Sequence, residues 1–397
     1  MTEPDKVQSS LGLPAGAKPG LLTLVGAGEL MPAMSAAHRD ALNQLRAPAR
    51  AVFLDTTAGF ESNADAITGK AVDYYKLRLQ TKLEVASYRH AGRAGAAETA
   101  RAVAAVRAAN FIFAGPGSST YALGQWRGSP LWDAIVDAFL AGTHMLFASA
   151  ASITLGRYAL PVYEIFKAGA DPYWADGLDL LGRMGLKLAV VPHYDDNSGG
   201  THYDSRFCYM GAARYELLQA LLPADVTILG IDAYTAVRFD PQQRVATVSG
   251  QGAITVLADG AVRMHAAGSA VPFDALHSAQ RAVVHMADEA PRTYGYEYGE
   301  PAGGEIALNG VHGYIEQLSG LDAATRVELL ARVVGALRSA APAAGAAAEP
   351  LLDLLLELRC DLRAAKQWAL ADKLRDAVVQ LGYEVQDTAT GSTWQPR

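Results

Sequence analysis

Three side chains that together can carry out nucleophilic catalysis follow one another along the chain: Ser149, Glu164 and His193. A serine hydroxyl is a weak nucleophile, so it needs a base that takes its proton and a carboxylate that holds this base in the correct tautomer. Histidine and glutamate are suited to these two roles. The run therefore predicts a hydrolytic site in which Ser149 attacks, His193 acts as the base and Glu164 orients His193.

The segments around Ser149 predict where its hydroxyl lies. Residues 144–148 (HMLFA) are typical of a short buried strand, and residues 150–157 indicate the start of a helix. Ser149 is then expected on a strand-to-helix turn, a nucleophile elbow that lifts a hydroxyl to the top of a sheet. Such an elbow usually has glycine two residues before and after the serine, whereas this chain has Phe147 and Ala151.

Short apolar segments alternate with helical segments from residue 20 onwards. Strands are predicted at 21–25, 51–54, 83–86, 111–114, 144–148 and 186–191, and a helix at 96–109. Near-continuous apolar strands separated by helices indicate a parallel sheet that is covered on both faces. Since sites in such sheets lie at the carboxyl ends of the strands, Ser149, the turn 115–117 and His193 are expected on one rim.

The rest of the chain divides into segments of different character. Short strands at 226–231, 236–239, 245–248 and 253–257 predict an antiparallel extension of the sheet. The predicted domains are a leader at 1–19, an α/β domain at 20–270, a helical extension at 271–338, an alanine- and proline-rich linker at 339–349 and a compact module at 350–397. Within that module, helices are expected at 351–366 and 369–381, followed by a hairpin of 383–387 and 391–394.

Composition narrows the class of protein. The chain has 397 residues, half of them hydrophobic, and a net charge of −7 without a long basic run, which does not favour generic binding of nucleic acid. The two cysteines, Cys208 and Cys360, lie in different predicted modules, so a disulfide framework is not expected and a cytoplasmic location fits best. No signal peptide is indicated, and no run approaches the roughly 20 apolar residues that cross a bilayer.

The α/β domain, over about residues 20–265, resembles the serine peptidase family of dipeptidase E and cyanophycinase. The matching segments are 25–29 (VGAGE), 113–119 (FAGPGSS), 147–151 (FASAA), 192–194 (PHY), 204–206 (DSR) and 230–236 (GIDAYTA). The resemblance implies a three-layer α/β/α sandwich, similar to class I glutamine amidotransferase domains. It also implies that Ser149 is the nucleophile, His193 the base and Glu164 the acid, and that no metal or cofactor takes part.

Two further roles complete the expected site. An oxyanion hole needs backbone N–H groups, and the candidates are Ala150, directly after the nucleophile, and Gly117, since Pro116 has no N–H. The dipeptidase branch prefers an acidic residue on the amino side of the cleaved bond. The resemblance therefore suggests that Arg206, whose guanidinium suits a carboxylate, binds an acidic group of a small peptide substrate.

The sequence also departs from the family pattern. Besides the two elbow positions, Ala233 stands where cyanophycinase-like members often carry glutamate. Other interpretations remain open: Ser149 as a packing or capping residue, Glu164 as a surface acid, and His193 as a metal ligand together with His202 and Asp204. The last cluster lacks the spacing of strong zinc signatures. A dinucleotide loop at 26–28 is discounted because Met31 replaces the third glycine.

The module at about 351–397 resembles the carboxy-terminal tail of cysteinyl-tRNA synthetase. The matching segments are 358–372 (LRCDLRAAKQWALAD), 374–376 (LRD), 382–388 (GYEVQDT) and 391–394 (GSTW). In the synthetase this region belongs to the anticodon-binding part, so tRNA is an expected partner. Because residues 349–397 contain six basic and eight acidic residues, binding would rely on a few base contacts, for which Arg375 and Trp394 are the candidates.

The sequence therefore also supports an alternative function to hydrolysis. In this alternative, the peptidase-like domain is a non-catalytic scaffold and the module binds tRNA or a translation partner. The module can also be read as a helical adaptor or dimerisation unit, because Trp368 and the leucines at 354, 355, 358 and 362 recur at helical spacing typical of a core. The sequence leaves the oligomeric state open, and a homo-oligomer is compatible with it.

Overall fold

The computed structural model describes residues 17–198, 203–258 and 261–278, together with Arg375, Val379, 383–388 and 391–396. The chain forms two compact units, Met1–Tyr294 and Gly295–Arg397. Each unit is considered by itself.

A parallel sheet forms the centre of the first unit. Five strands alternate with helices along the chain and lie in the spatial order β1-β5-β4-β2-β3: β1 (Leu22–Val25), β2 (Ala51–Leu54), β3 (Leu83–Ala86), β4 (Phe111–Ala114) and β5 (His144–Ala148). Each neighbouring pair is parallel. These bounds agree closely with the predicted strands. β1, β2, β4 and β5 are short, almost wholly buried apolar runs between turns, whereas Glu84 and Val85 in the middle of the edge strand β3 are exposed.

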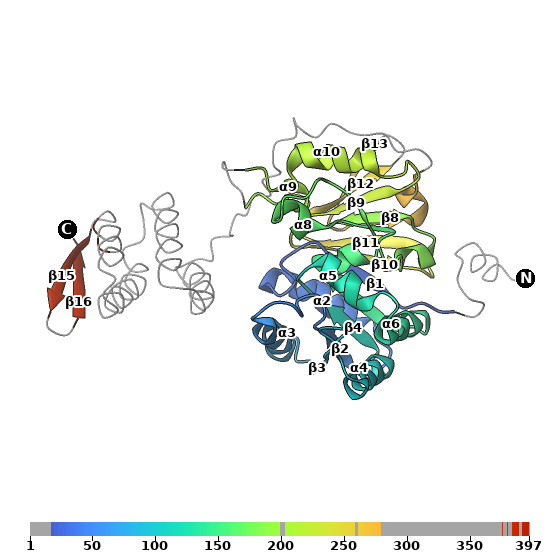
Figure 1. The fold of residues 1–397 in the computed structure, drawn as a ribbon, viewed down its shortest axis with the longest axis horizontal. Coiled ribbons are helices and arrows are strands. Elements are labelled where there is room, and N and C mark those ends of the chain that lie inside the picture. Colours follow the sequence, from blue (N-terminus) through green and yellow to red (C-terminus); the bar gives the residue numbers. More distant parts are fainter. Residues whose placement is uncertain are drawn as a thin grey trace, which may run out of the picture. The chain divides into compact units, whose positions relative to one another are not determined.

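Helices cover both faces of this sheet (Figure 1). The helices are α2 (Ser35–Asn43), α3 (Ala64–Arg78), α4 (Ala96–Ala108), α5 (Ser119–Trp126) and α6 (Pro130–Leu140). Alternate strand residues point to opposite faces: Ile112 and Phe147 join the core with α4, α5 and α6, whereas Phe113 and Leu146 join the core with α2 and α3. The three-layer α/β/α arrangement predicted from the sequence is confirmed.

The predicted antiparallel extension of the sheet is confirmed for the strands at 236–239 and 245–248. The strands at 226–231 and 253–257, and the strand at 186–191 that was expected in the parallel sheet, lie in a second sheet instead. On the first sheet, β10 (Thr235–Asp240), β11 (Val245–Gly250) and β14 (Ala270–Pro272) continue beyond β1. The second sheet has the order β13-β12-β9-β8-β6-β7. Its strands are β6 (Tyr158–Ala159), β7 (Ala175–Asp176), β8 (Leu188–Val191), β9 (Thr227–Ile231), β12 (Ala253–Ala258) and β13 (Ala261–Ala266). The division arises because the short turn 232–234 carries the chain from β9 in one sheet to β10 in the other.

Four helices accompany the second sheet. They are α7 (Ala150–Thr154), α8 (Val162–Phe166), α9 (Arg206–Tyr209) and α10 (Gly211–Leu221). Residues of β8, α8, α9 and α10 share one hydrophobic cluster, in which Tyr194, Phe207 and Tyr215 are fully or almost fully buried. Among the residues described, this unit also contains three single 3-10 turns: Pro32–Met34, Leu181–Met184 and Phe273–Leu276.

The remaining predicted domains fall mainly outside the described residues. Of the expected helical extension at 271–338, residues 271–278 are described and contain the end of β14 and the last 3-10 turn. The linker at 339–349 and most of the helices expected at 351–366 and 369–381 lie outside them. In the second unit, β15 (Tyr383–Thr388) pairs antiparallel with β16 (Gly391–Pro396), which confirms the predicted hairpin. Within the part of the chain that the structure describes, no helix is long and apolar enough to span a bilayer.

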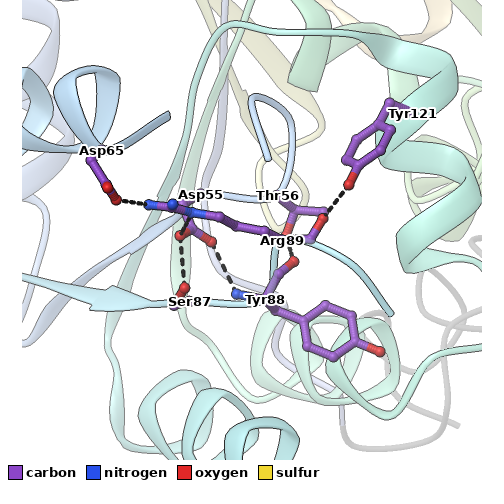
Figure 2. Close-up of polar contacts among 7 residues, drawn as sticks. All are labelled: Asp55, Thr56, Asp65, Ser87, Tyr88, Arg89 and Tyr121. Carbon is purple, nitrogen blue, oxygen red and sulfur yellow. Dashed lines mark hydrogen bonds and ion pairs between the residues drawn. The ribbon is translucent and has the colours of Figure 1, made fainter. Parts of the chain in front are cut away.

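Buried polar contacts hold the loops that follow the strands (Figure 2). Asp55, directly after β2, accepts hydrogen bonds from Ser87 Oγ, Tyr88 N and Arg89 Nε at 2.8–2.9 Å. Tyr121 in α5 in turn donates to the carbonyl of Arg89 at 2.6 Å. The loops after β2 and β3 are thereby joined to the helix that follows β4.

His38 in α2 is a second buried polar group with a complete set of partners. Its Nε2 lies 2.8 Å from the carbonyl oxygen of Glu29, which can only accept, so Nε2 carries the proton and Nδ1 accepts from the Tyr75 hydroxyl at 2.9 Å. Burial lowers the pKa of His38 from 6.5 to about 4. The imidazole is therefore neutral in the folded protein at neutral pH.

This histidine predicts a loss of stability in acid. The unfolded chain takes up the His38 proton near pH 6.5 and the folded chain only near pH 4, so the stabilisation present above pH 6.5 is lost as the pH falls toward 4. We expect the free energy of unfolding to fall by about 2 kcal/mol from this group between pH 7 and pH 4.5. Urea unfolding of the wild type and His38→Gln at both pH values measures it. If the free energy of unfolding fell equally in both proteins, His38 would not be the cause of the loss in acid.

Candidate active site

Ser149 occupies a strained turn between β5 and α7. Its backbone has φ 51° and ψ −122°, a conformation that non-glycine residues seldom adopt. Ser149 N donates to the carbonyl of Val25 at the end of β1, at 3.0 Å. The predicted strand-to-helix elbow is thus present at Ser149. Backbone strain of this kind is typical of functional sites.

The two residues that replace the usual elbow glycines lie beneath the turn. Phe147 and Ala151 are both fully buried in the main hydrophobic core. The Phe147 ring packs edge-on against Trp126 of α5, with ring centroids 6.1 Å apart. Because the phenylalanine side chain points into the core from β5, it leaves the outer side of the elbow open.

His193 reaches Ser149 from the second sheet. It follows β8 by two residues and has a positive φ of 49°. Its Nε2 lies 2.8 Å from Ser149 Oγ. The two residues that the sequence singled out as nucleophile and base, 44 positions apart, are therefore in hydrogen-bonding contact.

The electrostatic surroundings keep His193 available as a base. Burial lowers the pKa of the imidazole, and the negative charge of Asp196 partly opposes this shift. A neutral imidazole with its proton on Nδ1 presents the Nε2 lone pair to the Ser149 hydroxyl. This is the protonation state that general-base catalysis requires.

Glu164 lies in α8, and its carboxylate is held from α5. Its Oε1 accepts a hydrogen bond from Thr120 Oγ1 at 2.5 Å, while Oε2 is buried without a hydrogen-bond partner among the residues described. Within those residues, no hydrogen bond joins Glu164 to His193.

The turn after β4 contains Gly117, one of the two residues expected to form an oxyanion hole. Gly117 has φ +142°, and Ser118 N donates to the carbonyl of Thr57 at 3.0 Å. The Ser118 side chain caps α5 by accepting from Tyr121 N. In the described part of the chain, neither Gly117 N nor Ala150 N takes part in a hydrogen bond. Both groups therefore have no protein acceptor there.

Gly117 is predicted to tolerate no side chain. A Cβ atom at this position would lie 2.0 Å from the carbonyl oxygen of Thr57, and the backbone conformation disfavours any L residue. We expect Gly117→Ala to lower the free energy of unfolding by about 2–4 kcal/mol. Denaturant unfolding measures the change.

Gly124 in α5 provides the matched control, since a Cβ there meets no atom within 4 Å. Alanine at this helical position is expected to stabilise the protein by up to about 1 kcal/mol. If the two variants had the same stability, the close approach of Thr57 to Gly117 would not constrain the turn.

Arg206 is engaged within the protein. Its Nε and Nη2 donate to the two carboxylate oxygens of Asp204, at 2.8 and 2.7 Å. The Arg206 side chain is 11% exposed, and its guanidinium lies over the Phe207 ring at 5.2 Å. The fork that was expected to bind a substrate carboxylate is thus occupied by Asp204.

The alternative metal site finds no support in the part of the chain that is described. There, no group of three or more His, Cys, Asp or Glu residues is arranged to hold a metal ion. His202, one of the three suggested ligands, lies outside the described residues.

Two residues beside the site were missed in the sequence. Glu29 follows β1 and is almost fully buried, and its Oε1 lies 3.7 Å from the position that a Cβ of Gly115 would take. Burial raises the pKa of the Glu29 carboxyl. Asp196 follows His193 by three residues. The acidic pair 195–196 directly after 192–194 (PHY) is its signal in the sequence.

The candidate RNA-binding residues belong to the second unit. Arg375 is helical and exposed. Trp394 lies in β16, opposite Val385 of β15. Their placement in the module agrees with a helix followed by a hairpin.

Comparison with known proteins gives different matches for different parts of the chain. No family model matches the chain. A solved structure, a peptidase from an acI-B1 Actinobacterium, matches 65% of this chain and 98% of its own length, with a TM-score of 0.53 and 20% sequence identity. At this identity, the match shows a common fold.

The carboxy-terminal region is similar to cysteine–tRNA ligases. The ligase of Dehalococcoides mccartyi is 45% identical over 67 residues, which are 17% of this chain and 15% of the ligase. The ligase of Chlorobaculum tepidum is 37% identical over 92 residues, 20% of this chain and 19% of the ligase. This chain therefore spans less than a fifth of the length of these two curated relatives.

Proposed function

We propose that the protein is a serine hydrolase that cleaves a peptide or isopeptide bond in a small substrate. The observation that carries the proposal is the 2.8 Å contact between Ser149 Oγ and His193 Nε2, made at a strained strand-to-helix elbow. The fold shared with a peptidase agrees with this reaction class. Phe147 and Ala151 replace the usual elbow glycines, but both side chains are buried in the core and leave the Ser149 hydroxyl accessible to His193.

In the proposed reaction, His193 accepts and donates the proton at every step. His193 Nε2 takes the proton from Ser149 Oγ as this oxygen attacks the carbonyl carbon, and the resulting oxyanion accepts hydrogen bonds from Gly117 N and Ala150 N. His193 then donates the proton to the leaving nitrogen, which departs as an amine and leaves an acyl group on Ser149. Water, deprotonated by His193, releases the acid and restores the hydroxyl.

The role of Glu164 as the orienting acid stays a prediction of the sequence. What supports it is the buried Oε2, which has no hydrogen-bond partner among the described residues and can form a further bond in a substrate complex. The preference for acidic substrates also stays a prediction, since a substrate carboxylate would have to share Arg206 with Asp204.

Two measurements on the full chain test the proposal. A fluorophosphonate probe should label one residue, and mass spectrometry should place the label on Ser149. A panel of Asp-X dipeptides, β-aspartyl isopeptides and matched Ala-X dipeptides should contain a cleaved substrate and reveal any acidic preference. Absence of labelling together with absence of cleavage would refute the hydrolase.

The second unit suggests a further candidate function. We propose that the module resembling cysteine–tRNA ligase binds tRNA, on the basis of the 45% identity over 67 residues. Binding of tRNA to the full chain, followed by fluorescence anisotropy at several salt concentrations, should weaken in Arg375→Ala and Trp394→Ala. Equal affinity of the wild type and both variants would exclude base contacts at these residues.

A further inference from the structure

Three aromatic side chains from separate segments, Phe60, Tyr121 and Tyr163, form an aromatic patch. The Phe60 ring centroid lies 5.0 Å from that of Tyr121 in α5 and 6.3 Å from that of Tyr163 in α8, with interplanar angles of 48° and 74°. Phe60 is 44% exposed and Tyr163 is 37% exposed. The patch therefore presents apolar ring surface to solvent, and a ligand that covers it gains free energy.

The turn that carries Phe60 packs against the turn after β4. A Cβ atom at Gly117 would lie 2.0 Å from the carbonyl oxygen of Thr57 and 2.7 Å from Ala58 N. Phe60 follows Ala58 by two residues, and Glu61 N donates to the Ala58 carbonyl at 3.0 Å. One end of the patch is therefore attached directly beside Gly117, whose N–H is proposed to bind the oxyanion.

The backbone of Arg89 fixes two members of the patch. The Tyr121 hydroxyl donates to the Arg89 carbonyl at 2.6 Å (Figure 2). Gly59, directly before Phe60, approaches the same group so closely that a Cβ atom there would lie 2.7 Å from the Arg89 carbonyl oxygen. The rings of Phe60 and Tyr121 thus rest on a preformed support, so little ordering is needed when a ligand binds.

Helix α8 connects the other end of the patch to His193. Tyr163 and Phe166 are three residues apart and are neighbours on the helix surface. The Phe166 ring stacks on Tyr209 at 5.2 Å and 22°, and the Tyr209 ring centroid lies 5.7 Å from that of His193. Tyr209 ends a left-handed turn, since residues 207–209 have φ values of 58°, 57° and 68°. The patch thus extends from the side of Gly117 to the side of His193.

We propose that the aromatic patch of Phe60, Tyr121 and Tyr163 binds an aromatic side chain of the substrate, next to the bond that Ser149 attacks. This inference rests on the proposed hydrolase and names its substrate class, a small peptide with an aromatic residue beside the cleaved bond. Recognition by the patch does not require the Arg206 guanidinium, which Asp204 already binds.

The size and geometry of the patch fit one aromatic side chain. Phe60 and Tyr163 together expose on the order of 150 Å², about the area that a single aromatic side chain covers. A stable protein partner would bury about 800 Å² on each side. Because the three rings are tilted against one another, a fourth ring can make the offset or edge-to-face contacts that aromatic pairs prefer.

Binding to full-length Ser149→Ala, in which the proposed covalent route is closed, tests the preference directly. NMR titration compares Phe-Ala, Ala-Phe and Ala-Ala. The better of the two phenylalanine dipeptides should bind about 10-fold more tightly than Ala-Ala, and its identity assigns the patch to the acyl or the leaving side of the bond. Cyclohexylalanine in place of phenylalanine should bind more weakly, because it lacks the ring quadrupole.

Further substitutions in the same Ser149→Ala protein locate the preference. Phe60→Ala and Tyr163→Ala should each reduce it to about threefold or less, whereas Phe60→Tyr should retain it. Leu77→Ala is the matched control, since it removes another exposed apolar side chain, 74% exposed in α3. It should leave the preference unchanged. Thermal unfolding shows that each variant is folded.

Two binding results would overturn the inference: Ala-Ala that binds as tightly as both phenylalanine dipeptides, or a folded Phe60→Ala variant that keeps the full preference. A wild-type dimer that Phe60→Ala dissociates in sedimentation velocity would assign the patch to a contact between two copies, and would overturn it as well. Failure of the hydrolase itself looks different. The wild type would then neither cleave a dipeptide nor react with the fluorophosphonate, while the preference in binding remains measurable.

Discussion

Alanine at position 149 is expected to lower the rate of substrate hydrolysis by at least about 10⁴-fold. In serine hydrolases, removing the nucleophile costs about as much as removing the whole triad, and a small residual rate remains from the oxyanion hole and binding. Here Ser149 Oγ is the atom in contact with His193 Nε2 at 2.8 Å. In the proposed mechanism its removal deletes the acceptor of the acyl group and closes the covalent route. Steady-state hydrolysis of the best substrate in the panel measures the loss.

Ser152 offers a matched control for this change. It lies one helical turn further along α7, and its Oγ donates to the carbonyl of Ser149 at 2.6 Å. Ser152→Ala also removes one hydroxyl, but this hydroxyl points back toward the backbone and not toward His193. The control variant is expected to keep its activity within about tenfold of the wild type. Retention of full activity by Ser149→Ala would exclude Ser149 as the nucleophile.

Alanine at position 55 is expected to destabilise the fold by about 3–5 kcal/mol. The Asp55 side chain is 1% exposed and accepts three hydrogen bonds, from the Ser87 hydroxyl, the Tyr88 backbone and the Arg89 guanidinium (Figure 2). Without the carboxylate, the buried N–H of Tyr88 and the partly buried donors of Ser87 and Arg89 lose their acceptor. Equilibrium unfolding in guanidinium chloride measures the difference.

Asp65 provides a control that separates the effect of burying a carboxylate from the effect of its ion pair with Arg89. It binds the same arginine, through Arg89 Nη2 at 2.7 Å, but its side chain is 93% exposed. Solvent screens such a pair, so Asp65→Ala is expected to cost less than about 1 kcal/mol. If Asp55→Ala and Asp65→Ala lowered the free energy of unfolding by similar amounts, burial would not determine how much the Asp55 carboxylate stabilises the fold.

Local pattern was enough to predict the strands of the parallel core. Apolar runs such as 51–54 and 111–114 are bounded by turns and separated by helical segments, so strand positions and the covered sheet followed from periodicity. Ser149 after β5 and His193 after β8 were expected on one rim of a single sheet. The two strands belong to different sheets, and the folded chain brings the side chains to 2.8 Å across them. The hairpin at 383–394 was predicted for the same reason, because two short segments of strand character flank a turn.

Side-chain partners and the division into two sheets were decided only by the tertiary structure. The fork of Arg206 points to Asp204, and Glu164 bonds to Thr120, because rotamers and neighbouring helices settle which of several acceptors is reached. The positive φ values at 207–209 and the contact of Tyr209 with His193 depend on a left-handed turn that no glycine marks in the sequence. Sequence patterns record which residues are buried and where elements begin, since these follow from neighbours along the chain. Which partners the side chains of Glu164 and His193 reach depends on contacts between segments far apart, and only the folded chain determines them.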